Sequence, residues 1–255
     1  FNGWEEGYGT TYHANLSAPV HSHLMNFKAD FDIFGTQNSF IKTFVETVPV
    51  TSDTPGPDSD HEKVFLNGKT LYTKRMRSEV ITTEGKDSST AVVNTRKPTV
   101  WRIANTDVKN PYGEARGYAV IPARTNIQIL PDDHPFTLCS AFTKYNFAVT
   151  HRKDDEQHPT SVYDGYGMSE PYISLDDYLN DGDHLKQVDL VAWITVGKEH
   201  ITRSEDLPLV SNFGSGFMLQ PWNYFDRNGA LTSDAPPSET SDRATDNNGG
   251  CVLEV

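Results

Sequence analysis

The residues best suited to chemistry are two histidines one residue apart, His21 and His23, separated by Ser22. In a β-strand, side chains at positions i and i+2 lie on the same face, so a strand here would present two imidazoles together. Imidazole nitrogens suit copper, zinc and iron, and two of them make half of a metal site. The simpler alternative is a pair of ordinary surface histidines, because such pairs are common.

Two aspartates, Asp30 and Asp32, repeat this spacing nine residues further along the chain. Because nine is odd, these carboxylates would lie on the opposite face of a regular strand, roughly 25–30 Å from the histidines at a rise of about 3.3 Å per residue. Carboxylates and backbone carbonyl groups suit Ca²⁺, whereas imidazoles do not. The two pairs therefore predict two separate sites with different metal preferences.

A second segment mirrors this arrangement, with Asp189 before the apolar run Val191–Val196 and His200 after it. The separation of Asp189 and His200 is eleven residues, which is again odd. If the two segments pair as antiparallel strands, His200 meets the histidine pair at one end and Asp189 meets the aspartates at the other. One pairing then completes both sites, although a bulge or bend would break the parity.

The acidic stretch from Asp176 to Asp183 carries another group of carboxylates. It is not an EF-hand loop, because Gly182 stands at the wrong offset and the pattern shows no flanking helices. The stretch fits either an acidic turn or a second Ca²⁺ site built on Asp181, Asp183 and a backbone carbonyl group.

Short β-strands must position these groups. Runs of β-branched and aromatic residues alternate with clusters of Gly, Pro, Asn and Asp, which is typical of a β-sandwich or barrel. A helical period is found only at Asp58–Leu71. The polar stretches Thr51–Asp60 and Lys153–Pro171 are predicted to be loops, and residues 233–255 a mobile tail. The predicted strands are Phe40–Val50, Val80–Thr83, Ala91–Asn94, Val100–Ile103, Tyr118–Ile121, Phe147–Thr150 and Val188–Val196.

Composition and charge narrow the classes of function. The 255 residues are enough for one large all-β domain or two ordinary domains. The net charge of −13 argues against nucleic acid as a partner, and it suits cationic substrates, divalent metals or simply solubility. The longest apolar stretch, Val188–Val196, is far shorter than the roughly 20 residues that cross a bilayer, so no membrane span is predicted.

The cysteines and the termini bear on location. Cys139 and Cys251 are too few for a disulfide scaffold; they could pair with each other, link to a second chain or stay reduced. One glycosylation sequon, Asn15-Leu16-Ser17, permits secretion. The chain does not end in Ser-Lys-Leu, so an extracellular location is favoured over a peroxisomal one. Because the first residue is Phe1 and not Met, we interpret the chain as a fragment or processed product.

Several separated segments, in order, resemble the copper-containing primary amine oxidases, which carry the organic cofactor topaquinone. The resemblance implies a mainly β fold with little helix, built as a large β-sandwich with long hairpin arms. Residues 1–255 would form the carboxy-terminal part of one catalytic domain. The matching segments are His21–Asp30; Phe147–Thr150 with Glu156, similar to a hairpin arm; Ala192–His200; Arg203–Pro208; and Phe217–Pro221 with Phe225–Asn228.

The resemblance also implies metal sites and a homodimer. One copper ion would be bound by His21, His23 and His200. One calcium site would use Asp30, Asp32 and Asp189 with the carbonyl groups of Phe31 and Leu190. A second calcium site would use Glu84, Asp181 and Asp183 with the carbonyl group of Tyr178. At Asp183 the family more often has Glu, which carries a longer carboxylate.

The implied reaction converts a primary amine, O₂ and water to an aldehyde, ammonia and hydrogen peroxide. In the family, topaquinone is made from a Tyr in an Asn-Tyr-Asp/Glu motif upstream of the histidine pair, and the catalytic Asp base lies further upstream. Neither is found in this chain, since Asn223-Tyr224-Phe225 lacks the acidic residue. We therefore expect an upstream segment of the same protein to supply both, and the isolated chain to be inactive.

Two other classes of protein fit part of this pattern. A non-catalytic secreted β-sandwich could bind Ca²⁺ and Zn²⁺ through the same groups, and an upstream Asn-Tyr-Asp/Glu motif would argue against it. A cupin-like iron dioxygenase also uses a His-x-His pair and a distant His. It usually needs a nearby Glu ligand, and Glu46 and Glu62 are poorly placed for that role.

Overall fold

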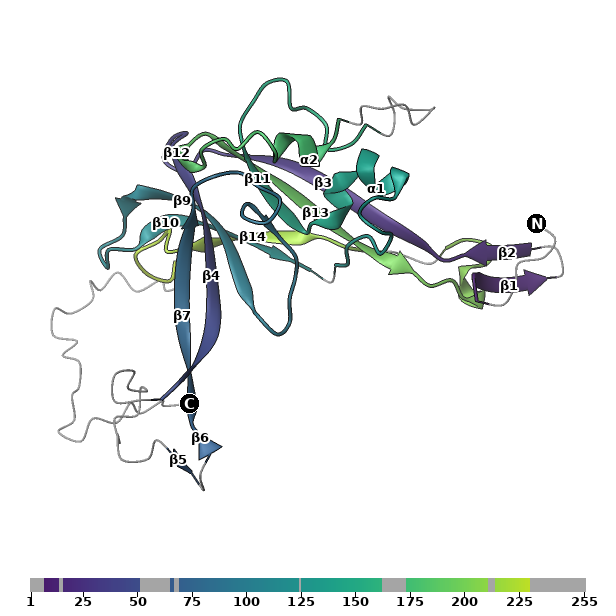
Figure 1. The fold of residues 1–255 in the computed structure, drawn as a ribbon, viewed down its shortest axis with the longest axis horizontal. Helices are drawn as coiled ribbons and strands as arrows, with labels where there is room; N and C mark the ends of the chain where they lie inside the picture. The colour runs from purple at the N-terminus through teal and green to yellow at the C-terminus, as the bar shows by residue number, and fades with distance from the viewer. Residues whose placement is uncertain are drawn as a thin grey trace.

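The computed structural model describes residues 7–13, 16–50, 65–66, 69–123, 125–161, 173–210 and 214–229. Its main body consists of antiparallel sheets, and its helices are short and lie in the connections between strands (Figure 1). The predicted mainly β fold is therefore confirmed. A search of the described helices for a long apolar span that could cross a membrane finds none.

The larger sheet has the strand order β12-β4-β9-β10-β14, and β7 also pairs with β4. All of its strand pairs are antiparallel. Its strands are β4 (Asn38–Pro49), β7 (Tyr72–Ile81), β9 (Thr99–Lys109), β10 (Ala115–Pro122), β12 (Lys186–Val188) and β14 (Phe217–Trp222).

The smaller sheet has the order β3-β13-β11-β8. Its strands are β3 (His21–Phe31), β8 (Thr90–Ala91), β11 (Phe147–His151) and β13 (Leu190–His200). Because β11 pairs with β13 on one edge and with β8 on the other, it is an internal strand. The expectation of a hairpin arm at this segment was wrong.

The remaining elements are two small hairpins and four short helical turns. The hairpins are β1 (Gly9–His13) with β2 (Leu16–Pro19), and β5 (Phe65–Leu66) with β6 (Lys69–Thr70). The helical turns are α1 (Pro135–Cys139), α2 (Leu175–Tyr178), η1 (Ala141–Lys144) and η2 (Ser204–Asp206). The described part of Asp58–Leu71 thus contains strands, and the helix expected there was wrong for those residues.

The predicted strands overlap observed ones, although Ala91–Asn94 does so only at Ala91, where β8 ends. Residues 153–161 contain no helix or strand, as expected for a loop. Thr51–Asp60, residues 162–171 and the tail 233–255 lie outside the described residues.

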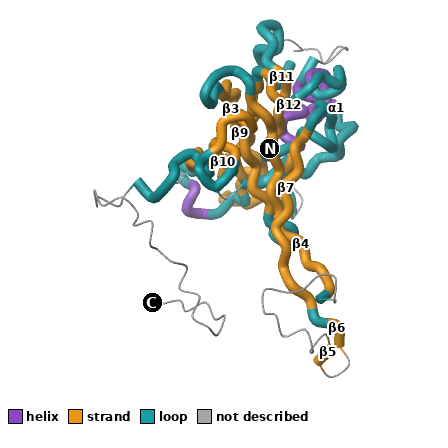
Figure 2. The backbone as a smooth tube through the Cα atoms, turned by 90° about the vertical axis from the view of Figure 1, so that its left-hand side faces the viewer, coloured by secondary structure: helices purple, strands orange, loops and turns teal. Residues whose placement is uncertain are grey.

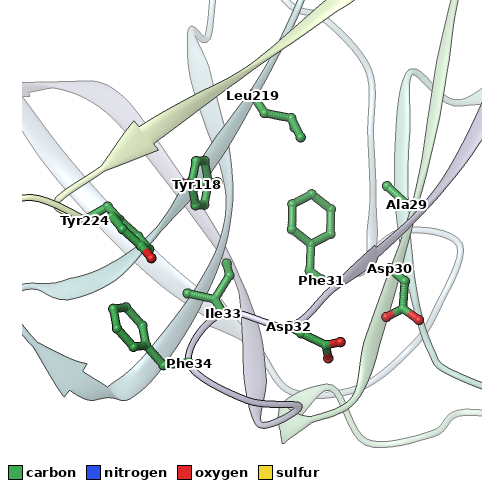
Figure 3. A pocket seen from close by; sticks show the side chains of 9 residues that line it. All are labelled: Ala29, Asp30, Phe31, Asp32, Ile33, Phe34, Tyr118, Leu219 and Tyr224. Carbon is green, nitrogen blue, oxygen red and sulfur yellow. The ribbon is translucent and has the colours of Figure 1, made fainter.

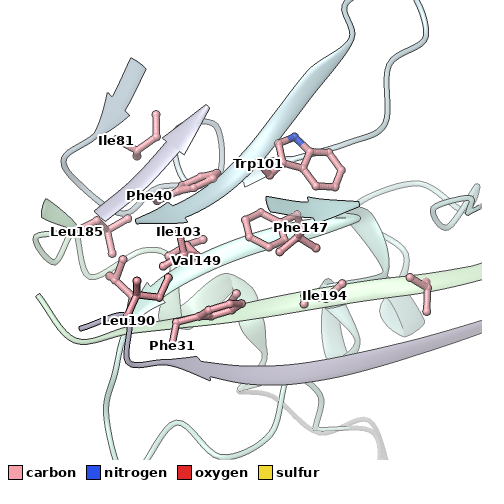
Figure 4. Close-up of a cluster of buried hydrophobic side chains, with 14 residues drawn as sticks. Phe31, Phe40, Ile81, Trp101, Ile103, Phe147, Val149, Leu185, Leu190 and Ile194 are labelled. Atoms are coloured by element: carbon pink, nitrogen blue, oxygen red, sulfur yellow. The ribbon is translucent and has the colours of Figure 1, made fainter. Parts of the chain in front are cut away.

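The hydrophobic core lies between the two sheets (Figure 4). Phe40 and Trp101 from the larger sheet pack on Phe147 from the smaller one, with ring centroids 5.3 Å and 5.4 Å apart. Burial of such aromatic rings contributes strongly to stability because it removes a large apolar area from water. The two packed sheets confirm the predicted sandwich.

The pairing of β3 with β13 runs without a break from Phe31 opposite Leu190 to His21 opposite His200. Phe31 and Leu190 face the core, so odd residues of β3 and even residues of β13 point into the sandwich. The other face is covered by a different cluster, in which Trp193 packs with Leu175 and Leu179 beside α2. The three histidines therefore belong to the core-facing side of the ladder, and the three aspartates to the opposite side.

A two-stranded ribbon extends away from the sandwich (Figures 1 and 2). Strand β4 pairs with β9 only from Ser39 to Phe44, whereas its pairing with β7 continues to Pro49. The end of this ribbon exposes apolar side chains, including Met76 at 71%. The sequence-based expectation of a long hairpin arm is met by this β4–β7 ribbon.

Candidate metal centre

The β3–β13 register brings the three predicted copper ligands together. His21 lies directly opposite His200, and His23 lies opposite Lys198. The ring centroids are 4.7 Å apart for His21 and His23, 4.8 Å for His21 and His200, and 5.6 Å for His23 and His200. One nitrogen from each ring lies within 4.8 Å of the other two, so the group could hold a metal ion.

In His21 and His200, a hydrogen bond to one ring nitrogen determines that the other nitrogen is available to a metal ion. Nδ1 of His21 lies 2.9 Å from the carbonyl oxygen of Pro19, and Nε2 of His200 lies 2.9 Å from Oδ2 of Asp206. A carbonyl or carboxylate oxygen can only accept, so each of these nitrogens carries the hydrogen. In the neutral rings, the lone pairs are then on His21 Nε2 and His200 Nδ1.

These two lone-pair nitrogens face each other at 3.3 Å. Two lone pairs at this distance repel each other unless a metal ion or a proton lies between them. Two nitrogens that each lie about 2.0–2.1 Å from a shared metal ion are roughly 2.9–3.4 Å apart, depending on the coordination angle. The donor atoms therefore fit a copper-sized ion.

The surroundings of His23 favour its neutral form. Burial lowers the pKa of His23, and the positive charges that His21 and His200 would carry lower it further. A neutral ring is the form that binds a metal. Within the described residues, the metal-binding group at this end contains only the three histidines.

Among the described residues no glutamate joins this group, as a cupin-like site would require. Glu46 is paired with Arg75 on the β4–β7 ribbon, at 2.6 Å, and Glu62 lies outside the described residues. The nearest acidic neighbour that contacts a histidine ring is Asp206, which hydrogen bonds to His200 from the outer side.

The predicted first calcium site is at the opposite end of the same ladder. Carboxylate oxygens of Asp30, Asp32 and Asp189 lie within 4.8 Å of one another. Burial and the charges of Asp30 and Asp32 raise the pKa of Asp189. Its Oδ1 is buried and has no hydrogen-bond partner among the described residues. The side chain of Arg152 donates to Asp30 Oδ2 at 3.1 Å, and its backbone N–H donates to the carbonyl oxygen of Asp189 at 2.9 Å.

Phe31 separates the two aspartates and points the other way, as strand alternation requires (Figure 3). Its ring enters a pocket of about 280 Å³ that is also lined by Tyr118 and Leu219. Its carbonyl oxygen accepts a hydrogen bond from Asn38 at 3.1 Å. Leu190, which was predicted to add a carbonyl ligand, lies opposite Phe31 in the ladder.

The predicted second calcium site also brings its carboxylates together, since oxygens of Glu84, Asp181 and Asp183 lie within 4.8 Å of one another. The fourth predicted member, Tyr178, directs its hydroxyl group to the carbonyl oxygen of His158, at 2.8 Å. A lysine that the sequence reasoning did not consider, Lys153, lies in contact with this acidic group.

Asp206 was also missed as a functional residue. Its side chain is only 5% exposed, and the same Oδ2 that accepts from His200 accepts from the backbone N–H of Arg203 at 3.0 Å. The segment Arg203–Pro208 had been noted for its resemblance alone. The sequence offers one signal for Asp206, because it lies a few residues after a predicted metal-binding histidine. Such histidines are commonly oriented by an acidic neighbour.

The fold and the site together are those of a β-sandwich with three imidazoles at one end of a strand pair and three carboxylates at the other, each a group that could hold a metal ion. The profile of the family described as copper amine oxidase, enzyme domain, matches residues 2–240. The chain therefore belongs to the copper amine oxidase family.

Relatives and solved structures agree with this assignment. The chain is 31% identical over 229 residues to a copper-containing diamine oxidase from Sus scrofa, covering 89% of this chain and 28% of that protein. It is 30% identical over 224 residues to a copper amine oxidase from Bipolaris victoriae, covering 87% of this chain and 30% of that protein.

The fold comparison gives the same family. The amine oxidase from Aspergillus nidulans superposes with a TM-score of 0.70 at 29% identity, covering 86% of this chain and 28% of that one. The lysyl oxidase from Pichia pastoris gives a TM-score of 0.72 at 25% identity, covering 87% and 29%. The chain thus spans less than a third of the length of these relatives.

Proposed function

We propose that this chain is the copper-binding portion of a primary-amine oxidase that converts primary amines, O₂ and water to aldehydes, ammonia and hydrogen peroxide. The observation that carries the proposal is the pair of lone-pair nitrogens of His21 and His200, which face each other at 3.3 Å beside His23. Membership of the copper amine oxidase family supports the same choice of metal.

The residues of this chain would hold and orient the metal. Copper bound to the three imidazoles would supply the one-electron chemistry that a quinone cofactor and O₂ require. Asp206 and the Pro19 carbonyl group would keep each ring in the tautomer that leaves the inner nitrogen free. Trp193 and Phe147 belong to the packed sandwich that keeps the two strands rigid.

The organic cofactor would come from outside these residues. Topaquinone requires a Tyr in an Asn-Tyr-Asp/Glu setting, and the sequence contains no such tripeptide. That quinone would supply the electrophilic chemistry for amine oxidation, and a carboxylate would act as the general base. We propose that an upstream segment of the same protein supplies both groups, so that this chain alone does not oxidise amines.

We also propose that Asp30, Asp32 and Asp189, with the carbonyl groups of Phe31 and Leu190, bind one Ca²⁺. The unpartnered buried Oδ1 of Asp189 and the clustering of three like charges support this assignment. Such a hard oxygen site fits Ca²⁺ and not copper. The calcium proposal is not extended to the second acidic group, because Lys153 already contacts two of its carboxylates.

The β4–β7 ribbon supports the proposal of a homodimer. A two-stranded ribbon is marginally stable in water unless it packs on something else. Its exposed apolar residues Val45, Tyr72 and Met76 would be covered by a second copy. Light scattering of the purified protein should give twice the chain mass, and Met76→Asp should shift it toward the monomer. A monomer before substitution would contradict this part of the proposal.

The decisive test is the metal content of the purified protein by mass spectrometry, with the electron paramagnetic resonance spectrum of the same sample. We expect about one copper per chain and an axial Cu(II) signal with nitrogen coupling. Calcium or zinc without copper would instead favour the non-catalytic sandwich. Peroxide release on addition of amine to the pure chain would disprove its predicted inactivity.

A further inference from the structure

The second acidic group differs from the first because one cation of the protein, Lys153, contacts two of its carboxylates, whereas Arg152 forms an ion pair only with Asp30 of the first group. Lys153 follows β11 in a loop, whereas Asp181 and Asp183 lie in the loop after α2. The Nζ atom of Lys153 is in contact with the carboxylate of Asp181, lies 2.7 Å from Asp183 and lies 3.4 Å from Glu156. An ammonium group has three N–H donors, and three carboxylates surround this one.

We propose that the ammonium group of Lys153 takes the place of a metal ion at the Glu84–Asp181–Asp183 group, so that an internal ion pair and not a second calcium joins these loops. The inference goes beyond the proposed function, since it requires neither copper nor amine oxidation. It differs from the sequence-based expectation of calcium at this position.

The two kinds of cation cannot share these oxygens. Calcium needs six to eight oxygen ligands at about 2.3–2.6 Å, and it would have to draw them from the carboxylates that Lys153 already contacts. With both cations present, like charges would repel each other over a few ångströms in a partly buried site. Either the lysine leaves or the metal does not bind.

Backbone hydrogen bonds hold the loops around this acidic group together without a metal ion. The backbone N–H of Glu84 donates to the carbonyl oxygen of Asp183 at 2.9 Å, and Leu185 donates to Thr82 at 2.9 Å. Gly182, with a φ of +73°, provides the left-handed turn between the two aspartates. The carboxylates are therefore kept close by hydrogen bonds that do not depend on a metal.

The charges of the group are also consistent with a single monovalent cation. Burial and, to a lesser extent, the neighbouring Asp181 raise the pKa of Glu84 to about 8, so Glu84 is largely protonated at neutral pH. Its Oε1 accepts a hydrogen bond from the backbone N–H of His151, at 2.6 Å. Its Oε2 is buried and has no hydrogen-bond partner among the described residues, and a proton on this oxygen leaves fewer negative charges to balance.

The test is a count of bound calcium by mass spectrometry after the purified protein is equilibrated with Ca²⁺ and freed of unbound metal. Lys153→Met removes the ammonium group at similar length, and we expect it to bind one more calcium per chain than the unsubstituted protein. Lys153→Arg, which keeps the positive charge, is the matched control and should show no gain. Adding Asp183→Asn to Lys153→Met should remove the gained ion.

A second measurement covers the case in which Lys153→Met does not fold. Asp181→Asn in the otherwise unsubstituted protein should leave the calcium count unchanged, because no calcium is bound there. Loss of one calcium in Asp181→Asn, or no gain in a folded Lys153→Met, would overturn the proposal. Copper measured in the same samples reports separately on the histidine site, so the two proposals can fail independently.

Discussion

The two ends of the β3–β13 ladder share one register but present different chemistry. At one end, three imidazoles on the core-facing side direct inner nitrogens toward one another, and hydrogen bonds fix the outer nitrogens of His21 and His200. At the other end, three carboxylates on the opposite side lie close together, and one buried oxygen of Asp189 has no hydrogen-bond partner within the described chain. The strand pair thus sets the geometry at both ends, whereas the residue type selects the metal.

The strongest test of the histidine end is the substitution of His200. His200→Ala removes one of the three imidazoles, and we expect stoichiometric copper to be lost while the calcium count stays the same. Metal analysis of the purified protein measures both ends at once. His158→Ala, at an exposed histidine elsewhere, is the control. If the His200 variant still carries one copper per chain, the three-histidine assignment is wrong.

A methyl group at Gly197 should disturb the histidine end more than the aspartate end. Gly197 has a φ of +156°, and an added Cβ would lie 1.9 Å from the carbonyl oxygen of His23. We expect Gly197→Ala to cost about 3 kcal/mol or more in the free energy of unfolding and to lower copper content. Gly214→Ala is the control, because its Cβ would meet open space. An unchanged denaturation midpoint would show that the strands can separate there without loss.

The outer carboxylate at the histidine end should have a smaller effect. Asp206→Asn keeps the size of the side chain but removes the charge that stabilises the N–H of His200, so copper affinity should fall about 10- to 100-fold. Copper titration in competition with a chelator measures the affinity, and the nitrogen coupling in the resonance spectrum reports the change at the ring. Glu205→Gln, exposed on the same turn, should bind copper normally. Equal affinities for both variants would mean that Asp206 has no positioning role.

At the aspartate end, Asp189→Asn should abolish the response to calcium. A ligand at about 100 times its dissociation constant stabilises a protein by about 2.7 kcal/mol, so thermal unfolding with and without Ca²⁺ should differ before substitution and coincide afterwards. Asp133→Asn, on an exposed loop, should retain the difference. Retention of the response in Asp189→Asn would remove calcium from this end of the ladder.

The last test concerns the second acidic group, where Glu84 should make stability depend on pH. Its folded pKa is raised from 4.5 to about 8, mainly by burial, so the folded state keeps a proton that the unfolded state loses. Stability should therefore fall as the pH rises from about 4.5 to about 8. The charged neighbours that face Glu84 from the adjoining loops are Lys153, Asp181 and Asp183 with Glu156 and His151.

Glu84→Gln removes this titration and should flatten that part of the stability profile, as measured by chemical denaturation across the range. Glu114→Gln, at an exposed glutamate before β10, is the matched control and should leave the profile unchanged. A profile that keeps its slope in Glu84→Gln would assign the pH dependence to another group.

Much of the metal centre could be read from residue spacing. The odd separations from His21 to Asp30 and from Asp189 to His200 predicted that, if the two strands paired as antiparallel neighbours, the two ligand sets would meet at opposite ends and on opposite faces, and the observed register agrees. That prediction succeeded because β3 and β13 pair without a bulge, so strand alternation holds along the whole ladder. The segments that resemble copper amine oxidases predicted the family, and the family comparison confirms it.

Local sequence patterns gave wrong predictions for two segments whose structure depends on pairing with other strands. The helical period at Asp58–Leu71 did not reveal the short strands β5 and β6, which depend on pairing with each other. The segment Phe147–Thr150 was read as an arm, yet it is covered on both edges and both faces in the centre of the sheet. A short apolar strand carries no signal for its position in a sheet, because that depends on which distant strands pair with it.

The amino-acid sequence by itself determined which side chains lie at each end of the β3–β13 pair, and therefore which metals would suit each end chemically. Only the tertiary structure determined which residues of the connecting loops contact His200 and Asp181. Asp206 meets His200 through the turn at η2, and Lys153 meets Asp181 from a loop 28 residues away. Such contacts depend on the path of connecting loops, which spacing does not encode, whereas strand alternation is a local property of the backbone.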